Sequence, residues 1–575
     1  MERILLINPS GWQKESINLG LSYLASSLMA HGFDVLILDL NRYEMSDAAF
    51  LENVRQFSPR LVGISIKTAT AREGGRLSRL LKEAMPEVIT VAGGPHMSLC
   101  PESYMRDYPS ISFGVMGEGE EAMVHLAKAI CNGGKVEKLN GIVWRQNGQI
   151  LLNKWMPPEN LDALMFPNLD VIQGFSWKNF RYPILSSRGC PFGCIYCCVN
   201  KLTGSRKWRY RTPENVVDEL ESLVRTKGIT SFEIWDDNFT LDLSRAKKIC
   251  QLLIDRKLNL SWYCHNGIRA DRIDEELAQM MKAAGCTSLA FGVESGSPVT
   301  FAAIKKGEPL SAVINAVKLV KKAGIKAVGY FIIGLPGDTL ERFVETVYFQ
   351  RSLELDHYVY GMLIPYPHTE LWEIVQTHGT MFCEITETQH FSDDMVPISF
   401  ELPDFPKADM IRAFYIAKYF DLFDAIRQVA DSVNLTVVHH VSPPMISHLP
   451  GMFIAGGSKI CHVVVGGDEA VVRALPSFTQ VPNTTKILFS DNMPSDIPFE
   501  NQIAVVDQGS NILERISPDS GLVLFDARRP LRHLTLVRLP KAGSLGARGA
   551  PDSDLKNDEK KNVFSKALDA LGIHP

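Results

Sequence analysis

Three closely spaced cysteines are the residues of this chain best suited to chemistry. Cys190, Cys194 and Cys197 stand in the string RGCPFGCIYCC, with the spacing C-x3-C-x2-C. A [4Fe–4S] cluster is usually held by four thiolates, so three ligands leave one iron open to a group that is not protein. Gly189 allows a tight turn, and Tyr196 places an aromatic ring between the last two ligands. The spacing therefore predicts an iron–sulfur site with one open iron.

Structural zinc and disulfide bonds are the alternative uses of such cysteines. Zinc takes four N or S ligands, commonly in paired C-x2-C spacings, and no second pair follows at a suitable distance. Cys198 falls outside the triplet's spacing, and such a cysteine is more often a small buried residue than a ligand. The remaining cysteines stand singly, without a disulfide framework; they are Cys100, Cys131, Cys250, Cys264, Cys286, Cys383 and Cys461.

Length and composition indicate an ordinary globular protein. The 575 residues predict about three domains, and 45% hydrophobic with 22% charged residues is a typical balance. A formal net charge of −5 gives no sign of a nucleic-acid partner. The N-terminal string MERILLINPSG lacks the features of a secretory signal, and no apolar run is long enough to span a membrane. Unpaired cysteines and an oxygen-sensitive cluster both favour the reducing cytoplasm.

Residues 1–150 read as a doubly wound α/β domain. Continuous apolar runs predict strands buried on both faces, as in a parallel sheet; they cover residues 3–8, 35–40, 61–66 and 88–92. Such sheets bind ligands at the carboxyl ends of their strands. The loops expected at that edge are residues 8–11, 65–70, 93–96 and 117–120. None is a G-x-G-x-x-G fingerprint, so a nicotinamide cofactor is not supported.

Residues 175–380 read as six β–α units. Strands are predicted at residues 183–187, 231–236, 261–268, 288–294, 327–333 and 358–365. Thr212 followed by Pro213 is a helix start, and Asp271 is predicted to cap a later helix. The alternation predicts a parallel, partly closed barrel, with reactive groups at the carboxyl ends of its strands. The cysteine loop follows the first of those strands.

This core resembles the radical S-adenosylmethionine (SAM) superfamily, whose motif is C-x3-C-x-aromatic-C. The strings WRYRTPENVVDEL, IWDDNFT, FGVESGS, FIIGLPGD and PYPHTEL are similar to stretches of its cobalamin-dependent members. The resemblance implies that the three cysteines hold a [4Fe–4S] cluster whose open iron binds SAM. The SAM contacts that it implies are Tyr196, Asp236, Asp237, Arg269, Glu294, Ser295, Gly334 and Gly337. The aspartates would lie near the SAM amine, Arg269 near its carboxylate, Glu294 near the ribose or amine, and the glycines beside the adenine. His368 departs from the commoner glycine of PYPGTEL.

The first domain resembles the cobalamin-binding domain that precedes many radical SAM cores. The similar strings are INPSG, LGLSYLA, VGIS, AGGPH and GEGEEA. The cobalamin contacts that this implies are Asn8, Ser65, Thr68, Gly93, Gly94, Pro95, Gly117 and Glu118. The motif D-x-H-x-x-G, whose histidine ligates cobalt, is absent, so the sequence names no lower axial ligand. The alternative is a flavodoxin-like domain whose glycines only make turns.

The other parts of the chain are less informative. Residues 151–174 read as a linker, and residues 381–430 as a helical closing segment with an amphipathic helix at 410–428. Residues 431–540 contain short strands, at 435–439, 463–465, 486–489 and 502–506, and form a small α/β region of unknown role. Residues 541–575 read as a polar linker and a terminal helix.

Taken together, the resemblance implies a cobalamin-dependent radical SAM methyltransferase. Such an enzyme generates a 5′-deoxyadenosyl radical and methylates an unactivated carbon of a small-molecule or peptide substrate, with electrons from a donor such as flavodoxin or ferredoxin. A cyclisation or rearrangement without methyl transfer is the first alternative. A methylthiotransferase would need a second three-cysteine site, and the first domain holds only Cys100 and Cys131. A non-catalytic cobalamin or redox sensor would need an output module. The sequence singles out no catalytic side chain.

Overall fold

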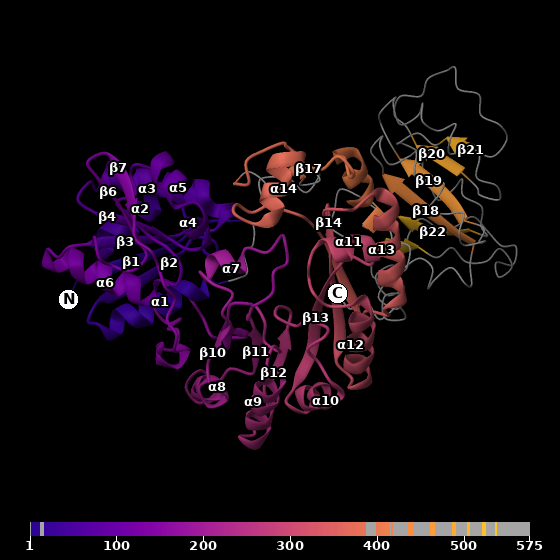
Figure 1. The fold of residues 1–575 in the computed structure, drawn as a ribbon, viewed down its shortest axis with the longest axis horizontal. Helices are drawn as coiled ribbons and strands as arrows, with labels where there is room; N and C mark the ends of the chain where they lie inside the picture. Colours follow the sequence, from indigo (N-terminus) through magenta and orange to yellow (C-terminus); the bar gives the residue numbers. More distant parts are fainter. Residues whose placement is uncertain are drawn as a thin grey trace, which may run out of the picture. The chain divides into compact units, whose positions relative to one another are not determined.

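The chain forms two compact units. The computed structural model describes residues 2–11, 17–386, 398–414 and 416–417, together with six strands between residues 434 and 537. The first unit is Met1–Met410 and the second is Ile411–Pro575 (Figure 1). The first unit contains the two sheets that the sequence predicts for residues 1–150 and 175–380.

A seven-stranded sheet organises the N-terminal part of the first unit. Its order is β2-β1-β3-β4-β5-β6-β7. The strands are β1 (Arg3–Asn8), β2 (Asp34–Asp39), β3 (Leu61–Ser65), β4 (Ile89–Gly93), β5 (Phe113–Val115), β6 (Ile142–Gln146) and β7 (Gln149–Leu152). Strands β1 to β5 are parallel, and β6 and β7 continue the sheet antiparallel. The predicted doubly wound sheet is confirmed, and β5 and the β6–β7 hairpin are additions that the sequence pattern did not predict.

Helices cover both faces of this sheet because its central strands are apolar on both faces. The helices are α1 (Leu19–Ala30), α2 (Asp47–Phe57), α3 (Ala71–Ala84), α4 (Pro95–Leu99), α5 (Pro101–Asp107) and α6 (Gly119–Asn132), with a 3-10 turn η1 (Thr68–Thr70). In β1, Ile4 and Leu6 pack toward α1 and α6, whereas Leu5 and Ile7 pack toward α2 and α3. Figure 1 shows these two helical layers.

Six parallel strands in chain order form the second sheet of this unit. Its order is β15-β14-β13-β12-β11-β8. The strands are β8 (Tyr182–Ile184), β11 (Ser231–Ile234), β12 (Ser261–Cys264), β13 (Cys286–Glu294), β14 (Lys326–Ile333) and β15 (His357–Met362). The helices are α8 (Pro213–Lys227), α9 (Leu243–Asp255), α10 (Glu275–Ala283), α11 (Pro298–Ala303), α12 (Leu310–Lys322), α13 (Leu340–Ser352) and α14 (Glu370–His378). Strictly sequential parallel order is the signature of repeated right-handed β–α units, so the predicted partial barrel is confirmed.

Helix starts in this region follow capping chemistry. Thr212 caps α8, as predicted, by accepting a hydrogen bond from the backbone of Asn215. The predicted cap at Asp271 is wrong, because α10 begins after Asp274, whose carboxylate accepts from the backbone of Leu277. An N-cap must stand just before the first turn. Asp271 stands too early and instead pairs with an arginine described below.

Strand β12 ends before the predicted boundary at Ile268. Gly267 has φ +72°, and a Cβ atom there would lie 2.6 Å from the carbonyl oxygen of Asp236. The backbone N–H of Phe239 donates to the carbonyl of Gly267 at 2.7 Å. The loop after β11 therefore packs directly on this glycine and turns the chain out of the sheet.

Short elements complete the first unit. They are β9 (Ser187–Arg188), β10 (Arg209–Tyr210), α7 (Val199–Leu202), η2 (Leu161–Ala163), β16 (Thr380–Met381) and β17 (Phe400–Glu401). Strands β9 and β10 pair antiparallel on either side of the cysteine loop, and β16 pairs with β17. Residues 407–414 are helical, in agreement with the start of the helix predicted at 410–428. Residues 415 and 418–428 of that prediction, and the predicted tail at 541–575, lie outside the described residues.

The second unit contains a six-stranded sheet. Its strands are β18 (Asn434–His440), β19 (Ile460–Val465), β20 (Lys486–Phe489), β21 (Ile503–Val505), β22 (Ser520–Leu524) and β23 (Thr535–Val537), in the order β21-β20-β19-β18-β22-β23. All pairs are parallel except β22 with β23. The four predicted strands are confirmed, and β22 and β23 were not predicted. Among all the described residues, no helix combines the length and apolarity needed to cross a membrane.

Candidate functional site

The cysteine loop lies between β9 and α7 and is shaped by close backbone contacts. Cys190, Cys194 and Cys197 are half-buried and form no disulfide. The backbone N–H of Cys197 donates to the carbonyl of Cys194 at 3.1 Å. Gly189 has φ +88°, and a Cβ atom there would lie 2.5 Å from the carbonyl oxygen of Lys207. The turn into the triplet thus requires a residue without a side chain.

The thiols of this loop are close enough to influence one another. Burial, with smaller contributions from the neighbouring thiols of Cys198, Cys194 and Cys190, raises the pKa of Cys197 to about 12. Burial also raises the pKa of Cys194. Within the described ranges, no three His, Cys, Asp or Glu side chains converge on the position of a single metal ion. A cubane cluster offers each thiolate a different iron, so its ligands need not converge on one point.

Two predicted aspartates hold the segment that leads into the triplet. Asp236 is buried and accepts three hydrogen bonds of 2.6 Å, from the backbone N–H and hydroxyl of Ser186 and from the hydroxyl of Ser187. Asp237 accepts from the backbone N–H of Gly189 at 2.8 Å. The carboxylates that follow β11 therefore fix residues 186–189 against the end of that strand.

A buried network of charges adjoins the other side of the cysteine loop. Lys306 lies 3.2 Å from Glu294 and 3.1 Å from Glu308. Arg269 pairs with Asp271 at 2.9 Å and with Glu308 at 3.6 Å. Two predicted SAM contacts, Arg269 and Glu294, are thus joined through Lys306 and Glu308, which the sequence motifs did not single out.

Aromatic rings connect this network to the cysteine loop. The guanidinium of Arg269 lies 3.6 Å from the ring centroid of Phe192. Burial, then the charge and hydrogen bond of Glu294, raise the pKa of Tyr196 far above its ordinary value. Glu294 has φ +64°, an uncommon conformation for a residue other than glycine. The structure therefore brings Tyr196, Arg269 and Glu294 together beside the triplet.

The remaining predicted SAM residues lie at the ends of β13 and β14. The hydroxyl of Ser295 is 2.9 Å from that of Thr346. Gly334 and Gly337 have φ of +98° and +83°, so both turns favour glycine. His368, where the family commonly has glycine, also has positive φ, and its ring nitrogen lies 3.0 Å from the carbonyl oxygen of Leu99. The histidine therefore keeps the glycine-like backbone and adds a contact to the N-terminal domain.

A cavity of about 390 Å³ opens between the first sheet and the residues that flank the cysteine loop, Arg188 before it and Val199 after it. Six predicted cobalamin residues line it: Ser65, Gly93, Gly94, Pro95, Gly117 and Glu118. Asn8 and Thr68 are not among its lining residues. Asn8 donates to Asp39 at 2.7 Å, and Thr68 lies 3.3 Å from a ring nitrogen of His96. These two side chains therefore make hydrogen bonds within the first domain instead of facing the cavity.

Residues of the barrel line the same cavity. They are Leu185, Arg188, Val199, Leu202, Thr203, Trp235 and Asp237. Asp237 is thus the predicted SAM residue that faces the cavity, and its neighbour Gly189 begins the cysteine loop. The cavity volume is within the usual range of small-molecule sites. Residues from the motifs that resemble a cobalamin-binding domain and from the motifs that resemble a radical SAM core therefore line the same cavity.

Comparison with known proteins identifies the two domains. The profile described as the Radical SAM superfamily matches residues 184–349, and that of the B12 binding domain matches residues 13–127. An uncharacterized methyltransferase of Pyrococcus horikoshii is 34% identical over 359 residues, which are 62% of this chain and 77% of that protein. The chain belongs to the B12-binding radical SAM family.

Other relatives of this B12-binding radical SAM protein differ in their reactions. An anaerobic magnesium-protoporphyrin IX monomethyl ester cyclase of Rubrivivax gelatinosus is 28% identical over 64% of this chain and 69% of its own. The radical SAM methyltransferase TsrM of Kitasatospora setae, solved with tryptophan substrate and a SAM analogue, has a TM-score of 0.56 at 23% identity. The match covers 66% of this chain and 76% of TsrM. This likeness confirms the predicted fold.

The residues of this B12-binding radical SAM protein fit the cofactors of its family, which are a [4Fe–4S] cluster, SAM and cobalamin. Three unpaired thiols on one short loop are the donor set of a cluster with an open iron. Gly93, Gly94 and Gly117 line the cavity, and glycines permit a large planar ligand to approach the backbone.

Sequence reasoning missed several residues of this candidate site. Asn18 donates to Ser65 at 2.8 Å and lines the cavity. Arg188 stands next to Gly189 in the string RGCPFGC, so its position beside the cluster motif was a usable signal. Lys306 and Glu308 carried no such signal, because they stand outside the motifs that they join.

The buried carboxyl of Asp338 should make the stability of this protein depend on pH. Burial raises the pKa of Asp338 to about 7 from an ordinary value of 3.8, although its carboxylate accepts a 2.9 Å hydrogen bond from Thr300. Between those values the folded state binds a proton that the unfolded state has lost. The free energy of unfolding should therefore fall as pH rises through this window, by up to about 1.4 kcal/mol per pH unit.

The variant Asp338→Asn should remove this contribution. Urea unfolding of wild type and variant across the window measures the two slopes. The wild type should lose stability more steeply than the variant as pH rises. Equal slopes would show that the Asp338 carboxyl titrates at its ordinary pKa in the folded protein.

Proposed function

We propose that this protein is a cobalamin-dependent radical SAM methyltransferase that methylates an unactivated carbon of a small-molecule or peptide substrate. The observation that carries the proposal is the shared cavity. Glycine loops of the B12-binding domain line one part of it, and Arg188 and Asp237, which flank the cysteine loop, line another. Such a cavity lets one substrate reach the reactive groups of both cofactors.

The chain's own residues position this chemistry. Bound here, the cluster and SAM supply a 5′-deoxyadenosyl radical for hydrogen abstraction, and cobalamin supplies the methyl group. Cys190, Cys194 and Cys197 would hold the cluster, while Asp236 and Asp237 keep the preceding segment in place. The group of Tyr196, Arg269 and Glu294 supplies a cation and a carboxylate beside the triplet, as a zwitterionic ligand such as SAM requires. An apolar lining, including Leu185, Leu202 and Trp235, limits water around the reacting carbon.

The proposal extends to partners and surroundings. The cluster needs an electron donor, for which flavodoxin or ferredoxin is the proposed class. An oxygen-sensitive cluster and the buried thiols of Cys250, Cys264 and Cys286, which form no disulfide in the described part of the chain, favour a reducing compartment, which we propose is the cytoplasm. The proposed domain limits are residues 1–150 for cobalamin and residues 175–380 for the cluster and SAM.

Replacement of one cluster ligand tests the core of the proposal. The protein would be reconstituted anaerobically with iron, sulfide and cobalamin, and then incubated with SAM and a reductant. Wild type should bind about four irons per chain and release 5′-deoxyadenosine. Cys194→Ala should lose at least about 100-fold of this release, because the open iron no longer holds SAM near an intact cluster. Cys198→Ala, which alters a thiol outside the spacing, should retain both iron and activity. Equal release by wild type and Cys194→Ala would refute the assignment.

Cyclisation or rearrangement without methyl transfer is the second candidate, favoured by the similarity to the magnesium-protoporphyrin cyclase. The two reactions leave different products. Methyl transfer forms S-adenosylhomocysteine together with 5′-deoxyadenosine, and the substrate gains the mass of one methylene group. A cyclisation consumes SAM without S-adenosylhomocysteine and adds no carbon. Mass spectrometry of both the nucleosides and the substrate therefore decides between them.

A further inference from the structure

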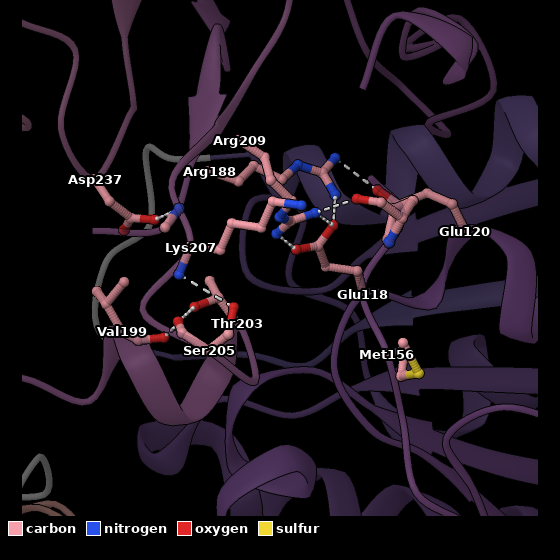
Figure 2. Close-up of polar contacts among 12 residues, drawn as sticks. Glu118, Glu120, Met156, Arg188, Val199, Thr203, Ser205, Lys207, Arg209 and Asp237 are labelled. Carbon is pink, nitrogen blue, oxygen red and sulfur yellow. Dashed lines mark hydrogen bonds and ion pairs between the residues drawn. The ribbon is translucent and has the colours of Figure 1, made fainter. Parts of the chain in front are cut away.

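Four buried charges connect the B12-binding domain to the barrel. The Arg–Glu cluster consists of Arg188, Arg209, Glu118 and Glu120. Arg188 donates to Glu118 at 2.8 Å and to Glu120 at 2.7 Å. Arg209 donates to both carboxylate oxygens of Glu118, one of them at 3.1 Å. Figure 2 shows both guanidinium groups directed at the Glu118 carboxylate. Each domain contributes two members, so the cluster spans the boundary between them.

The cluster is buried and neutral overall. The side chains of Arg188, Arg209, Glu118 and Glu120 are 12%, 2%, 11% and 7% exposed. Burial raises the pKa of Glu118, but the hydrogen bonds and charges of Arg209 and Arg188 outweigh it, so that the pKa lies below its ordinary value. Buried ion pairs add little net stability relative to apolar packing. A buried cluster at this position therefore calls for a role other than stability.

The two arginines form a rigid pair. Arg188 of β9 and Arg209 of β10 are direct partners in the antiparallel ladder. Arg209 also donates to the carbonyl of Pro158 at 2.6 Å, and the Arg188 guanidinium lies 5.2 Å from the ring centroid of Tyr23. Guanidinium forks bind carboxylates with a defined geometry that an ammonium group does not impose. The arrangement therefore fixes both the distance and the relative orientation of the arginine-bearing and glutamate-bearing segments.

Each side of the cluster belongs to a cofactor loop. Gly117, Glu118, Gly119 and Glu120 all line the cavity, and the backbone N–H of Gly117 donates to Ser98 at 2.8 Å. On the barrel side, Arg188 directly precedes Gly189, whose N–H is held by Asp237, and Cys190 follows. The Arg–Glu cluster thus connects the loop assigned to cobalamin, through Arg188, to the segment that carries Cys190.

We infer that the Arg–Glu cluster is a positioning device that fixes the separation and orientation of cobalamin relative to the iron–sulfur cluster, with Arg188 and Glu118 as its central positioning residues. The inference rests on the proposed function for the identity of the two cofactors. Loss of the Arg–Glu cluster should leave each cofactor bound while altering their mutual geometry. Radical formation at the iron–sulfur cluster should then continue while transfer of the methyl group declines.

Magnetic coupling between the cofactors tests this geometry without relying on turnover. Holoprotein reconstituted with cluster and hydroxocobalamin would be reduced to the paramagnetic Co(II) and [4Fe–4S]⁺ states. Pulsed electron paramagnetic resonance would then measure the relaxation of the Co(II) signal caused by the cluster. Dipolar coupling falls with the cube of distance, so a small displacement changes it measurably.

Three variants separate charge from geometry. Glu118→Gln removes the negative charge and keeps the shape of the side chain. Arg188→Lys keeps the positive charge and removes the planar guanidinium that can bind two carboxylates. Glu121→Gln, an exposed neighbour on α6, is the control.

The expected result is a relaxation rate changed at least about twofold in Glu118→Gln and Arg188→Lys, with Glu121→Gln equal to wild type. The ratio of S-adenosylhomocysteine to 5′-deoxyadenosine should fall about tenfold or more in the same variants, since misplacement of about 1 Å can cost 100-fold in rate.

Unchanged relaxation in both variants, with both cofactors bound, would overturn the inference. If Glu118→Gln does not fold, Arg188→Lys decides, and failure of both to fold would show that the Arg–Glu cluster serves stability alone. A wild type that never transfers methyl would defeat the proposed function, whereas the relaxation measurement would still judge the positioning role.

Discussion

Lys306→Met should destabilise the first unit by about 3–5 kcal/mol, the cost of removing one partner from a buried ion pair. The Lys306 ammonium contacts two carboxylates, Glu294 and Glu308, and the carbonyl of Gly292. The Lys306 and Glu308 side chains are 7% and 0% exposed. Methionine of similar length would leave the buried Glu294 carboxylate without this cation and would leave Glu308 with Arg269, at 3.6 Å. Urea unfolding of the apoprotein, followed by circular dichroism, measures the change.

The adjacent lysine supplies the control for this prediction. Lys305 pairs with Glu370, but its side chain is 60% exposed. Exposed pairs contribute about 1 kcal/mol or less, so Lys305→Met should leave the free energy of unfolding nearly unchanged. Equal losses in the two variants would show that Lys306 does not neutralise the buried carboxylates. Apoprotein is used because cofactor binding would add its own stabilisation.

The same network bears on why part of the site was predictable and part was not. Arg269 and Glu294 stand at strand ends, where topology places ligand-binding groups, and family motifs mark both. Lys306 and Glu308 stand after α11, in a segment that resembles an ordinary helix end. Only the packing of that segment against β13 reveals that they complete the charge balance.

Most of the fold could be predicted because local patterns determine it. The string RILLIN of β1 is apolar on both faces and thus required helices on both sides of the sheet. Boundaries that depend on tertiary contact were harder to predict. The early end of β12 depends on Gly267 meeting the backbone after β11, and the true cap of α10 depends on which of two nearby aspartates begins the helix.

The roles of predicted site residues depended on partners that no motif contains. Asp236 was predicted beside SAM, but its carboxylate is occupied by Ser186 and Ser187. Glu118 was predicted beside cobalamin and does line the cavity, yet its oxygens bind Arg188 and Arg209. A motif indicates that a residue belongs to a site, whereas hydrogen-bond partners distant in sequence decide what the side chain does there.

Gly189→Ala, which adds a single methyl group, should also strongly destabilise the protein. Its φ of +88° alone costs a residue with a side chain about 1–2 kcal/mol. A Cβ atom would in addition lie 2.5 Å from the backbone oxygen of Lys207, which cannot rotate away as a side chain can. Gly189→Ala should therefore displace the segment that carries Cys190 and destabilise the apoprotein by about 3 kcal/mol or more.

The functional consequence of that displacement should be failure to assemble the cluster. Gly189→Ala should bind less than about half of the wild-type iron after anaerobic reconstitution, because cluster ligands must be held in a defined geometry. Gly228→Ala is the control, since Gly228 has φ +66° at the end of α8 and a Cβ atom there would meet no neighbouring atom within 4 Å. It should lose about 1 kcal/mol of stability and retain its iron. Full iron content in Gly189→Ala would mean that the loop tolerates the methyl group, and that the turn before Cys190 does not determine how the cluster is held.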